Sequence, residues 1–449
     1  MASEQQYLEL YRAQRPLLEA GSCAPLNALR AAAAEALAAG GLPGRRVERY
    51  KYVDVEHALA PDYGVNLRRS LPGYDPYGGF RCSVPGLRTA ALRAVINDVV
   101  CPAPEDGGGA LPGGAVVIPL TEAATRMPGL LEAHYGQAAG RGYDALTALN
   151  TMLVQDGILV YVPSGVRLEH PVQLVHLSTA GADLMSNRRL LVVLEDGAEA
   201  SLLLCDHAPG RQRYLTTQVV EAYVGRGARL DLCTVEETNP RVTRFDNLYV
   251  EQQAGSRVAC HTVNLSGGLT RSRADFRLLG PDAAVVADGA VVAAGRQYVD
   301  HNLLVEHAAP RCTSDLLFKY VLDGSAVGAF AGRVLVQPGA QQTVSQQTSA
   351  NLCASPSARA YAQPMLEIYA DDVKCNHGAT VGKLDESALF YMRQRGIPEA
   401  EARLLLQHAF INDVLLRVSP EVLRDRLSQL VENRFRGIAS RCHACSLCS

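Results

Sequence analysis

The sequence predicts a mainly β protein whose centre is a β-solenoid, flanked by N-terminal and C-terminal helical regions. From about Gly157 to Gly382, short alternating or β-branched segments are separated by glycine-centred turns, with no helical run of useful length between them. Three similar turns place Gly197, Gly227 and Gly255 at spacings of 30 and 28 residues. Such a period is typical of stacked units, and two strands per unit without a crossover helix favour a solenoid over a doubly wound α/β sheet. A β-sandwich with regularly spaced turns is the alternative.

The region before the solenoid, residues 1–145, is expected to be largely helical. Apolar residues around Tyr7 precede a second apolar run from Leu26 to Ala39, which two glycines end. The stretch near 104–114 is so rich in glycine and proline that we expect a flexible surface loop.

The solenoid is expected to occupy residues 146–382 and a C-terminal helical domain residues 383–438. Asp385–Arg395 is predicted to form a short helix, Pro398 to begin a second, and Ser419 with Pro420 to cap and begin a third. The apolar stripes of these helices are expected to make core contacts. Part of such a stripe is also suited to docking a partner.

The last eleven residues, 439–449, are expected to form a disordered, cysteine-rich tail. Cys442, His443, Cys445 and Cys448 supply four possible metal ligands within seven residues, without a second, distant pair. Two readings stay open for this tail, a metal site and a nonspecific, oxidation-prone terminus.

Bulk properties exclude several classes of protein. The formal net charge is -3 and no Lys/Arg run is present, which argues against nucleic-acid binding. No apolar stretch approaches the roughly 20 residues that span a bilayer, and the N-terminus lacks the features of a signal peptide. We therefore expect a cytoplasmic protein whose twelve cysteines are reduced.

The candidate site is the pair Cys375 and His377, in the segment Glu367–Gly382, which is predicted to be a strand. Alternate residues of a strand share a face, so the thiol and the imidazole should point the same way. Both groups suit zinc, copper or iron–sulfur chemistry. Two ligands leave a four-coordinate site incomplete, so other groups must complete it. The structural alternative is a small buried cysteine beside a hydrogen-bonded histidine.

Two other patterns do not support catalysis. Gly378–Lys383 resembles a phosphate loop, but its glycine spacing is one residue short and Leu384 stands where a magnesium ligand belongs. Asp371 and Asp372 are adjacent, and adjacent residues of a strand face opposite sides, which disfavours a paired acid and base.

Several segments together carry a family resemblance. They are Leu42–Tyr52, Ala148–Pro171, Gly328–Arg333, Ala340–Thr343, Leu366–Gly382 and Leu389–Gly396. On these segments the chain resembles the SufB/SufD family of iron–sulfur cluster assembly proteins, and within it the SufD branch. The run Ala370–Cys375 is typical of SufD, and Gly378 stands where SufB usually has Glu.

The resemblance implies a right-handed parallel β-helix between helical regions, and a noncatalytic scaffold subunit. It implies a SufB-like partner at the β-helix and a SufC-like ABC ATPase, which hydrolyses ATP, at the C-terminal helices. Cys375 and His377 match the positions of a cysteine and a histidine at the SufB interface, where an iron–sulfur cluster forms transiently. A cysteine desulfurase system and a reduced flavin in the complex are further implied partners.

Two other functions stay open. One is a SufB-type homo-oligomeric cluster scaffold, and the other is a β-helical carbohydrate-active enzyme, which needs a groove of acidic residues. Cys353 stands where SufD usually has an aliphatic residue, and we expect it to be buried in place of one. Gln342 stands where the family often has Lys, and the cysteine-rich tail is also outside the usual pattern.

Overall fold

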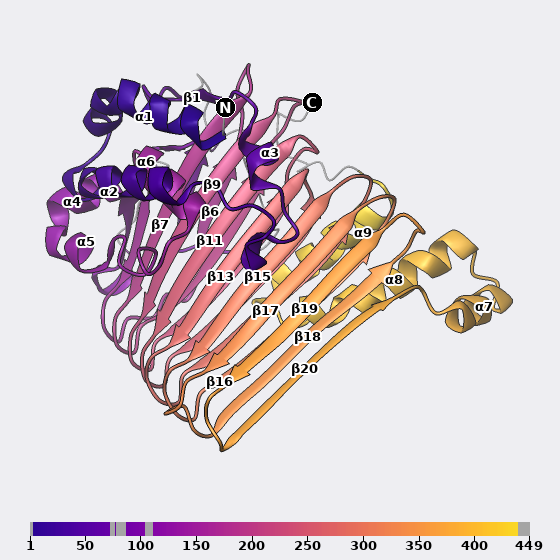
Figure 1. Cartoon of the computed structure of the whole chain (residues 1–449). Coiled ribbons are helices and arrows are strands. Elements are labelled where there is room, and N and C mark those ends of the chain that lie inside the picture. Colours follow the sequence, from indigo (N-terminus) through magenta and orange to yellow (C-terminus); the bar gives the residue numbers. More distant parts are fainter. Residues whose placement is uncertain (1–2, 72–76, 78–86, 104–110, 439–449) are drawn as a thin grey trace.

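A parallel β-solenoid of about eight turns dominates the structure (Figure 1). The computed structural model describes residues 3–71, 77, 87–103 and 111–438. Strands alternate along the chain between two sheets, so each coil contributes one strand to each sheet. The mainly β fold with flanking helices that the sequence predicted is confirmed.

Sheet A has β19 at one edge and β4 at the other. Its strands, in spatial order, are β19 (Arg359–Ile368), β17 (Val327–Val336), β15 (Tyr298–His307), β13 (Leu269–Leu278), β11 (Val242–Gln252), β9 (Tyr214–Val224), β7 (Leu184–Leu194), β5 (Ile158–Val162) and β4 (Val116–Pro119), with β1 (Gly64–Val65) paired to β7. All of these pairs are parallel except that of β4 with β5.

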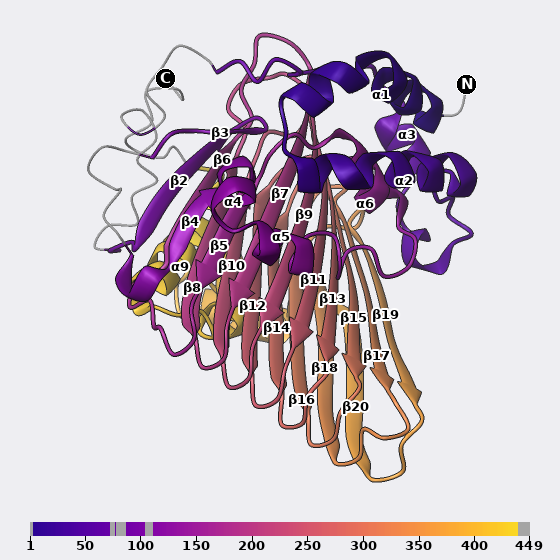
Figure 2. The ribbon, with the colours of Figure 1, turned by 90° about the vertical axis from the view of Figure 1, so that its left-hand side faces the viewer.

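Sheet B lies opposite and has β20 as its last strand. Its strands are β20 (Val373–Gly382), β18 (Thr343–Cys353), β16 (Thr313–Leu322), β14 (Ala284–Ala293), β12 (Arg257–Ser266), β10 (Arg229–Glu237), β8 (Glu199–His207), β6 (Val172–Leu177), β2 (Ala91–Ile96) and β3 (Val99–Val100). Only β2 and β3 pair antiparallel here. Figure 2 shows β2 and β4 at one end of the solenoid and β19 and β20 at the other.

The core lies between the two sheets, because side chains of equivalent positions stack from coil to coil. Val220 of β9 is in register with Leu248 of β11, and Ala222 with Val250. Val250 and Phe276 are almost completely buried in this cluster. Each large apolar side chain buried in this way contributes about 1.5–3 kcal/mol, so the inner stacks stabilise the whole column.

The repeated glycines form a second stack, at the turns. Gly197, Gly227 and Gly255 all have positive φ, at 71°, 64° and 68°, a conformation that glycine adopts without strain. The turns are joined by backbone hydrogen bonds, from Gly197 N–H to the Arg226 carbonyl at 2.8 Å and from Gly227 N–H to the Ala254 carbonyl at 2.9 Å. The period predicted from these glycines is therefore the length of one coil.

The N-terminal helices cover part of sheet A. They are α1 (Ser3–Ala20), α2 (Ala24–Gly40), η1 (Glu48–Tyr50), α3 (Val55–Leu59), η3 (Pro112–Gly114), α4 (Leu120–Arg126), α5 (Pro128–His134) and α6 (Ala145–Leu153). Tyr7 and Leu37 share an apolar cluster with Met185, Leu215 and Phe245 of the sheet.

Residues 1–145 are not helical throughout, since they also hold β2 and β4, which extend the two sheets. Most of the predicted glycine- and proline-rich loop, residues 104–110, lies outside the described residues. Across the described ranges, no helix is long and apolar enough to cross a membrane.

Three helices follow the solenoid, close to the predicted boundaries. They are α7 (Glu386–Gln394), α8 (Glu399–Leu415) and α9 (Glu421–Phe435). The stripes of α8 and α9 do make core contacts: Ile411, Leu415 and Leu427 are buried in one cluster with Val235 and Val263 of sheet B. Pro420, rather than Ser419, occupies the cap of α9.

His307 gives the stability of the solenoid a specific pH dependence. Burial lowers its pKa to about 4, against about 6.5 in an unfolded chain. Between these values the unfolded state binds a proton that the folded state does not, so stability falls as the pH drops from 6.5 to 4.

We therefore expect the stability advantage of the wild type over His307→Gln, which cannot titrate, to shrink by up to about 3 kcal/mol between pH 7 and pH 4. Denaturant unfolding of both proteins across this range measures it. An advantage that does not change with pH would contradict a buried, neutral imidazole.

Candidate functional site

The candidate pair lies on β20, the last strand of sheet B. The strand is shorter than predicted: Glu367 belongs to β19, residues 369–372 form the connection, and only Val373–Gly382 is β20. Asp371 and Asp372 thus lie in a turn, so the argument from strand alternation does not apply to them.

Cys375 and His377 both face the inside of the solenoid, as strand alternation predicted. Cys375 is in register with Ser345 of β18, and His377 with Gln347. Ser345 and Gln347 are buried on the inner face. In the described chain no further coil stacks on β20. The inward-facing side chains of this strand therefore lie at the end of the solenoid.

Cys375 is half-buried and His377 is exposed. Burial raises the pKa of the Cys375 thiol, and a hydrogen bond with the backbone of Ser345 opposes part of that effect. The sulfur packs against the apolar core of the last coils. The thiol is therefore protonated at neutral pH, and a metal that bound it would displace the proton.

The end of the solenoid also exposes strand edges and apolar side chains. β19 pairs only with β17, and β20 only with β18, among the residues that the structure describes. Ile368, Tyr369 and Val381, at or near the ends of these strands, are 39%, 63% and 56% exposed. Unpaired edges beside apolar surface are suited to strand addition by another chain. The sequence predicted that the pair lies on a terminal strand near an edge, but no sequence pattern predicted these exposed apolar side chains.

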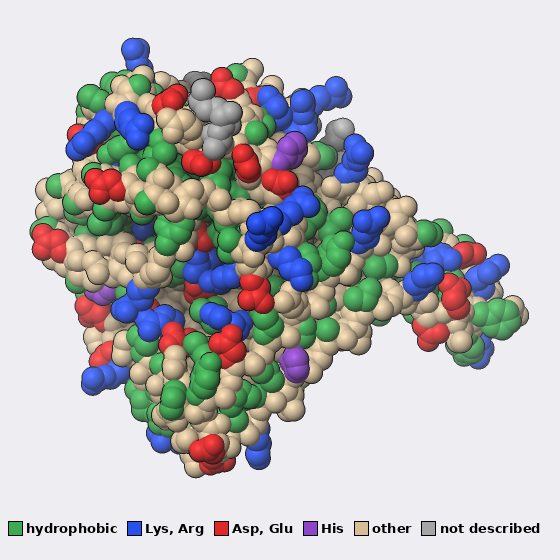
Figure 3. Space-filling model, viewed as in Figure 1, with side chains coloured by type: hydrophobic (Ala, Val, Ile, Leu, Met, Phe, Trp, Pro, Cys, Tyr) green, Lys and Arg blue, Asp and Glu red, His purple; other side chains and the backbone are tan. Residues whose placement is uncertain are grey.

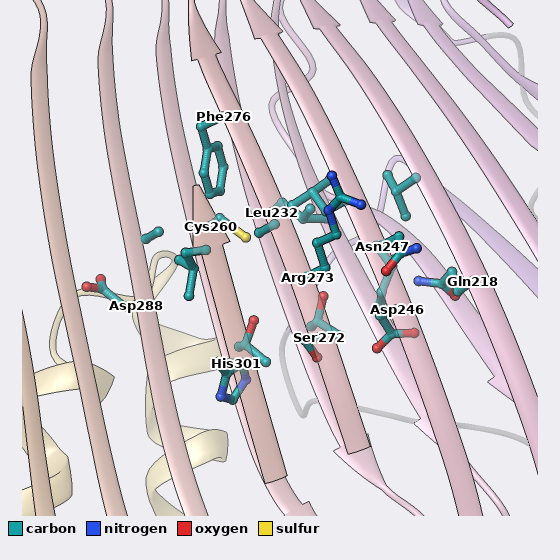
Figure 4. Close-up of a pocket in the computed structure, with 18 of the residues that line it drawn as sticks. Gln218, Leu232, Asp246, Asn247, Cys260, Ser272, Arg273, Phe276, Asp288 and His301 are labelled. Carbon is teal, nitrogen blue, oxygen red and sulfur yellow. The ribbon is translucent and has the colours of Figure 1, made fainter. Parts of the chain in front are cut away.

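A second candidate is an internal cavity of about 60 Å³ between the sheets (Figure 4). Gln218, Asp246, Ser272 and His301 of sheet A line it, with Cys260 of sheet B. The side-chain atoms Gln218 Oε1, Asp246 Oδ1 and His301 Nε2 are buried without a hydrogen-bond partner in the described structure. The volume is sufficient for a few water molecules, which are the natural partners of such atoms.

Aromatic rings lie between this cavity and the final coils. The ring of Phe318 is 5.1 Å from that of His301 and 4.9 Å from that of Phe330. Burial lowers the pKa of His301 to about 3, so this imidazole is neutral at physiological pH. Cys375 and His377 do not line the cavity, and the two sites are separate.

The other candidate ligands do not join the pair. Cys442, His443, Cys445 and Cys448 lie outside the described residues. Cys353 ends β18 and packs against the core as an aliphatic residue would, but it is half-buried and not fully buried as expected. Within residues 3–438 as described, no three His, Cys, Asp or Glu side chains gather closely enough to hold a metal ion.

Comparisons with known proteins cover nearly the whole chain. The model of the SufBD protein N-terminal region matches residues 1–174, and that of the SufBD core domain of SUF system FeS cluster assembly matches residues 176–410. An iron–sulfur cluster assembly SufBD family protein of Synechocystis is 29% identical over 416 residues, 90% of each chain. The iron–sulfur cluster assembly protein SufD of Escherichia coli is 25% identical over 88% of this chain and 90% of its own. SufD of Bacillus subtilis is 27% identical over 65% and 67%.

The half-buried thiol should be distinguishable from the buried ones by its alkylation rate. We expect iodoacetamide to modify Cys375 in the native protein at least about tenfold faster than the fully buried Cys312, yet more slowly than in the unfolded chain, because its pKa is raised. Quantitative mass spectrometry of the separate peptides measures both rates. Equal protection of the two cysteines would contradict the exposed inner face of β20.

Proposed function

The chain belongs to the SufBD family and is SufD-like, and from this premise we propose that it is a noncatalytic scaffold subunit for iron–sulfur cluster assembly. Members of this family take part in iron–sulfur cluster assembly. The proposed subunit pairs with a SufB-type chain through the open end of its solenoid. It binds a SufC-type ATPase through its C-terminal helices. The observation that carries the proposal is the position of Cys375 and His377 on the terminal strand β20, whose second edge has no pairing strand in the described chain.

The open end supports pairing because it has what a strand-adding partner needs. Within the part of the chain that the structure describes, the outer edges of β19 and β20 offer unpaired backbone groups. Ile368, Tyr369 and Val381 offer apolar area for burial. A second solenoid that presented a similar end would satisfy both surfaces at once.

Pairing would also complete a ligand set. A thiolate and an imidazole fill half of a tetrahedral coordination sphere, and iron–sulfur clusters are held by thiolates and, in some proteins, by imidazoles. The remaining ligands would come from the partner, so that the site exists only in the assembly. The cluster is the cargo of this site, built there and passed on. Its sulfur would come from a cysteine desulfurase system, and a reduced flavin in the complex would supply electrons.

The projecting helix α7 supports a second contact, with the ATPase. Phe390 and Tyr391 of this helix are 62% and 58% exposed, and aromatic side chains are frequent anchors of interfaces. In the space-filling view this part of the chain stands out from the body of the molecule, with hydrophobic side chains at its tip (Figure 3). ATP hydrolysis belongs to that partner in this proposal.

The base of the helical domain is bonded to the solenoid. Arg417, just after α8, forms ion pairs of 3.1 Å with Asp288 of β14 and 2.9 Å with Asp315 of β16. Because α7 packs against α8, a movement imposed on α7 would reach this sheet through α8 and Arg417. This coupling gives nucleotide-driven rearrangement a route to the half-site.

A homo-oligomeric scaffold is the second candidate, because an unpaired strand edge can pair with a copy of the same chain as well as with another protein. Two copies of this chain could join their open ends around a twofold axis, which would bring two Cys375–His377 pairs together. Sedimentation of the purified chain, alone and with its SufB-type partner, separates the two candidates. A heterodimer that forms at the expense of a homodimer supports the first.

The half-site predicts a loss of function without a loss of fold. In cells that lack their own copy, the double variant Cys375→Ala with His377→Ala should lose at least about 90% of the activity of an iron–sulfur reporter enzyme, because an incomplete coordination sphere holds iron weakly. Cys353→Ala, on the neighbouring strand, is the matched control and should complement fully. Full complementation by the double variant would refute the half-site.

The pairing surface predicts a loss of affinity for the SufB-type chain. Ile368→Asp combined with Val381→Asp should weaken association at least about thirtyfold, because carboxylates would be buried among apolar groups. Leu17→Asp changes a similarly exposed apolar residue on α1 and should have no effect. Calorimetric titration measures the affinities. Unchanged binding of the double variant would move the interface elsewhere.

A further inference from the structure

The segment between α2 and α3 runs across the outer face of sheet A, and no role has yet been given to it (Figure 1). We call residues 45–54 the strap. It includes most of Leu42–Tyr52, one of the segments that carry the family resemblance. Its contacts reach strands that lie more than 200 residues further along the chain.

The middle of the strap is anchored to β13 and β15. The guanidinium of Arg49 binds both carboxylate oxygens of Asp275, at 2.6 and 3.3 Å, and donates to Asn302 Oδ1 at 2.8 Å. The carbonyl of Arg49 accepts a hydrogen bond of 2.7 Å from the fully buried Arg271. The guanidinium of Arg271 also lies 3.9 Å from the ring centre of Tyr50. Several partly buried, charge-assisted bonds fix this anchor.

The end of the strap is attached to β19. The ring of Tyr52 stacks on Tyr361 with 4.9 Å between centres and 18° between planes. Its hydroxyl donates to Gln363 Oε1 at 3.1 Å, and Gln363 Nε2 donates to Glu48 of the strap at 3.3 Å. The carbonyl of Tyr52 accepts a hydrogen bond from the hydroxyl of Tyr298 on β15.

Tyr52 therefore links β15 to β19 across the strand between them, β17. This link matters because β19 is hydrogen-bonded to a neighbouring strand on one side only within the described chain. In a solenoid each coil is stabilised by its neighbours, so the last coil has the lowest local stability. The strap gives that coil a second attachment, to strands deep in the column.

We propose that the strap is a clamp that orders the terminal coil in advance of association, with Arg49 and Tyr52 as positioning residues. Ordering β19 before binding lowers the entropy that association must remove. It also holds β20, which follows β19 after a short turn, in the position from which Cys375 and His377 face a partner. The ordering of the terminal coil by the strap does not depend on the proposed function, whereas its effect on association rests on that function.

Amide hydrogen exchange of the full chain, without partners, tests the clamp. In Tyr52→Ala, exchange in β19 and β20 should become faster by about tenfold, because a stacked ring and a hydrogen bond are lost, while β7 and β9 keep their wild-type rates. Tyr161→Ala is the matched control: Tyr161 is a partly buried tyrosine at the other end of sheet A, bonded to Glu195. It should leave β19 and β20 unchanged.

Tyr52→Phe keeps the stacked ring and loses only the bond to Gln363, so it should fold normally and accelerate exchange in β19 by a smaller factor. Wild-type rates in β19 for both Tyr52 variants would refute the clamp. Equal acceleration in every coil would also refute it, because the strap would then support the whole fold.

Affinity for the SufB-type partner tests the second half of the proposal. Tyr52→Ala should weaken association about tenfold, and Tyr161→Ala should not. Unchanged affinity despite faster exchange in β19 would refute preorganisation. Failure of the Cys375 and His377 variants to impair cluster assembly would instead refute the half-site and leave the exchange result standing.

Discussion

The structure depends on one constraint, that each coil supplies the hydrogen-bonding partners of the next. Parallel strands in register pair the backbone N–H and carbonyl groups of successive coils, and the same register stacks apolar side chains between the sheets. The constraint has a boundary, because a stack of coils must end. At β19 and β20 it leaves one row of backbone groups on each sheet without a coil to pair with in the described chain.

The proposed function follows from that unpaired end. Capping residues or helices would have stabilised the isolated chain, yet α8 and α9 pack along the outer face of sheet B and not over its edge. Among the described residues no further strand pairs with the last coil, which carries a thiol and an imidazole on its inner face. The strap offsets part of the resulting loss of order, since it ties β19 to the middle of sheet A through Arg49 and Tyr52. A surface that is exposed and yet ordered is suited to binding.

The solenoid and the shared face of Cys375 and His377 could be predicted from the sequence, because both follow from short-range periods. Gly197 and Gly227 mark one coil each, and residues two apart on a strand lie on one side. The boundary of β20 could not be predicted well, since residues 369–372 make the turn without glycine or proline. The contact of Tyr52 with Gln363 spans 311 positions, and no local pattern encodes which distant strand a tyrosine meets. The open end depends on how the coils stack, and no pattern of single residues predicts it.

We propose that this chain holds half of a site which association completes. The most direct measurement is the iron and acid-labile sulfide bound after anaerobic assembly on the chain alone, on the SufB-type chain alone and on their complex. We expect the complex to bind more iron and sulfide than the sum of its separated chains, and Cys375→Ala with His377→Ala to remove the excess while the complex still forms. An isolated chain that binds as much iron and sulfide as the complex, or an excess that survives the double substitution, would refute the half-site.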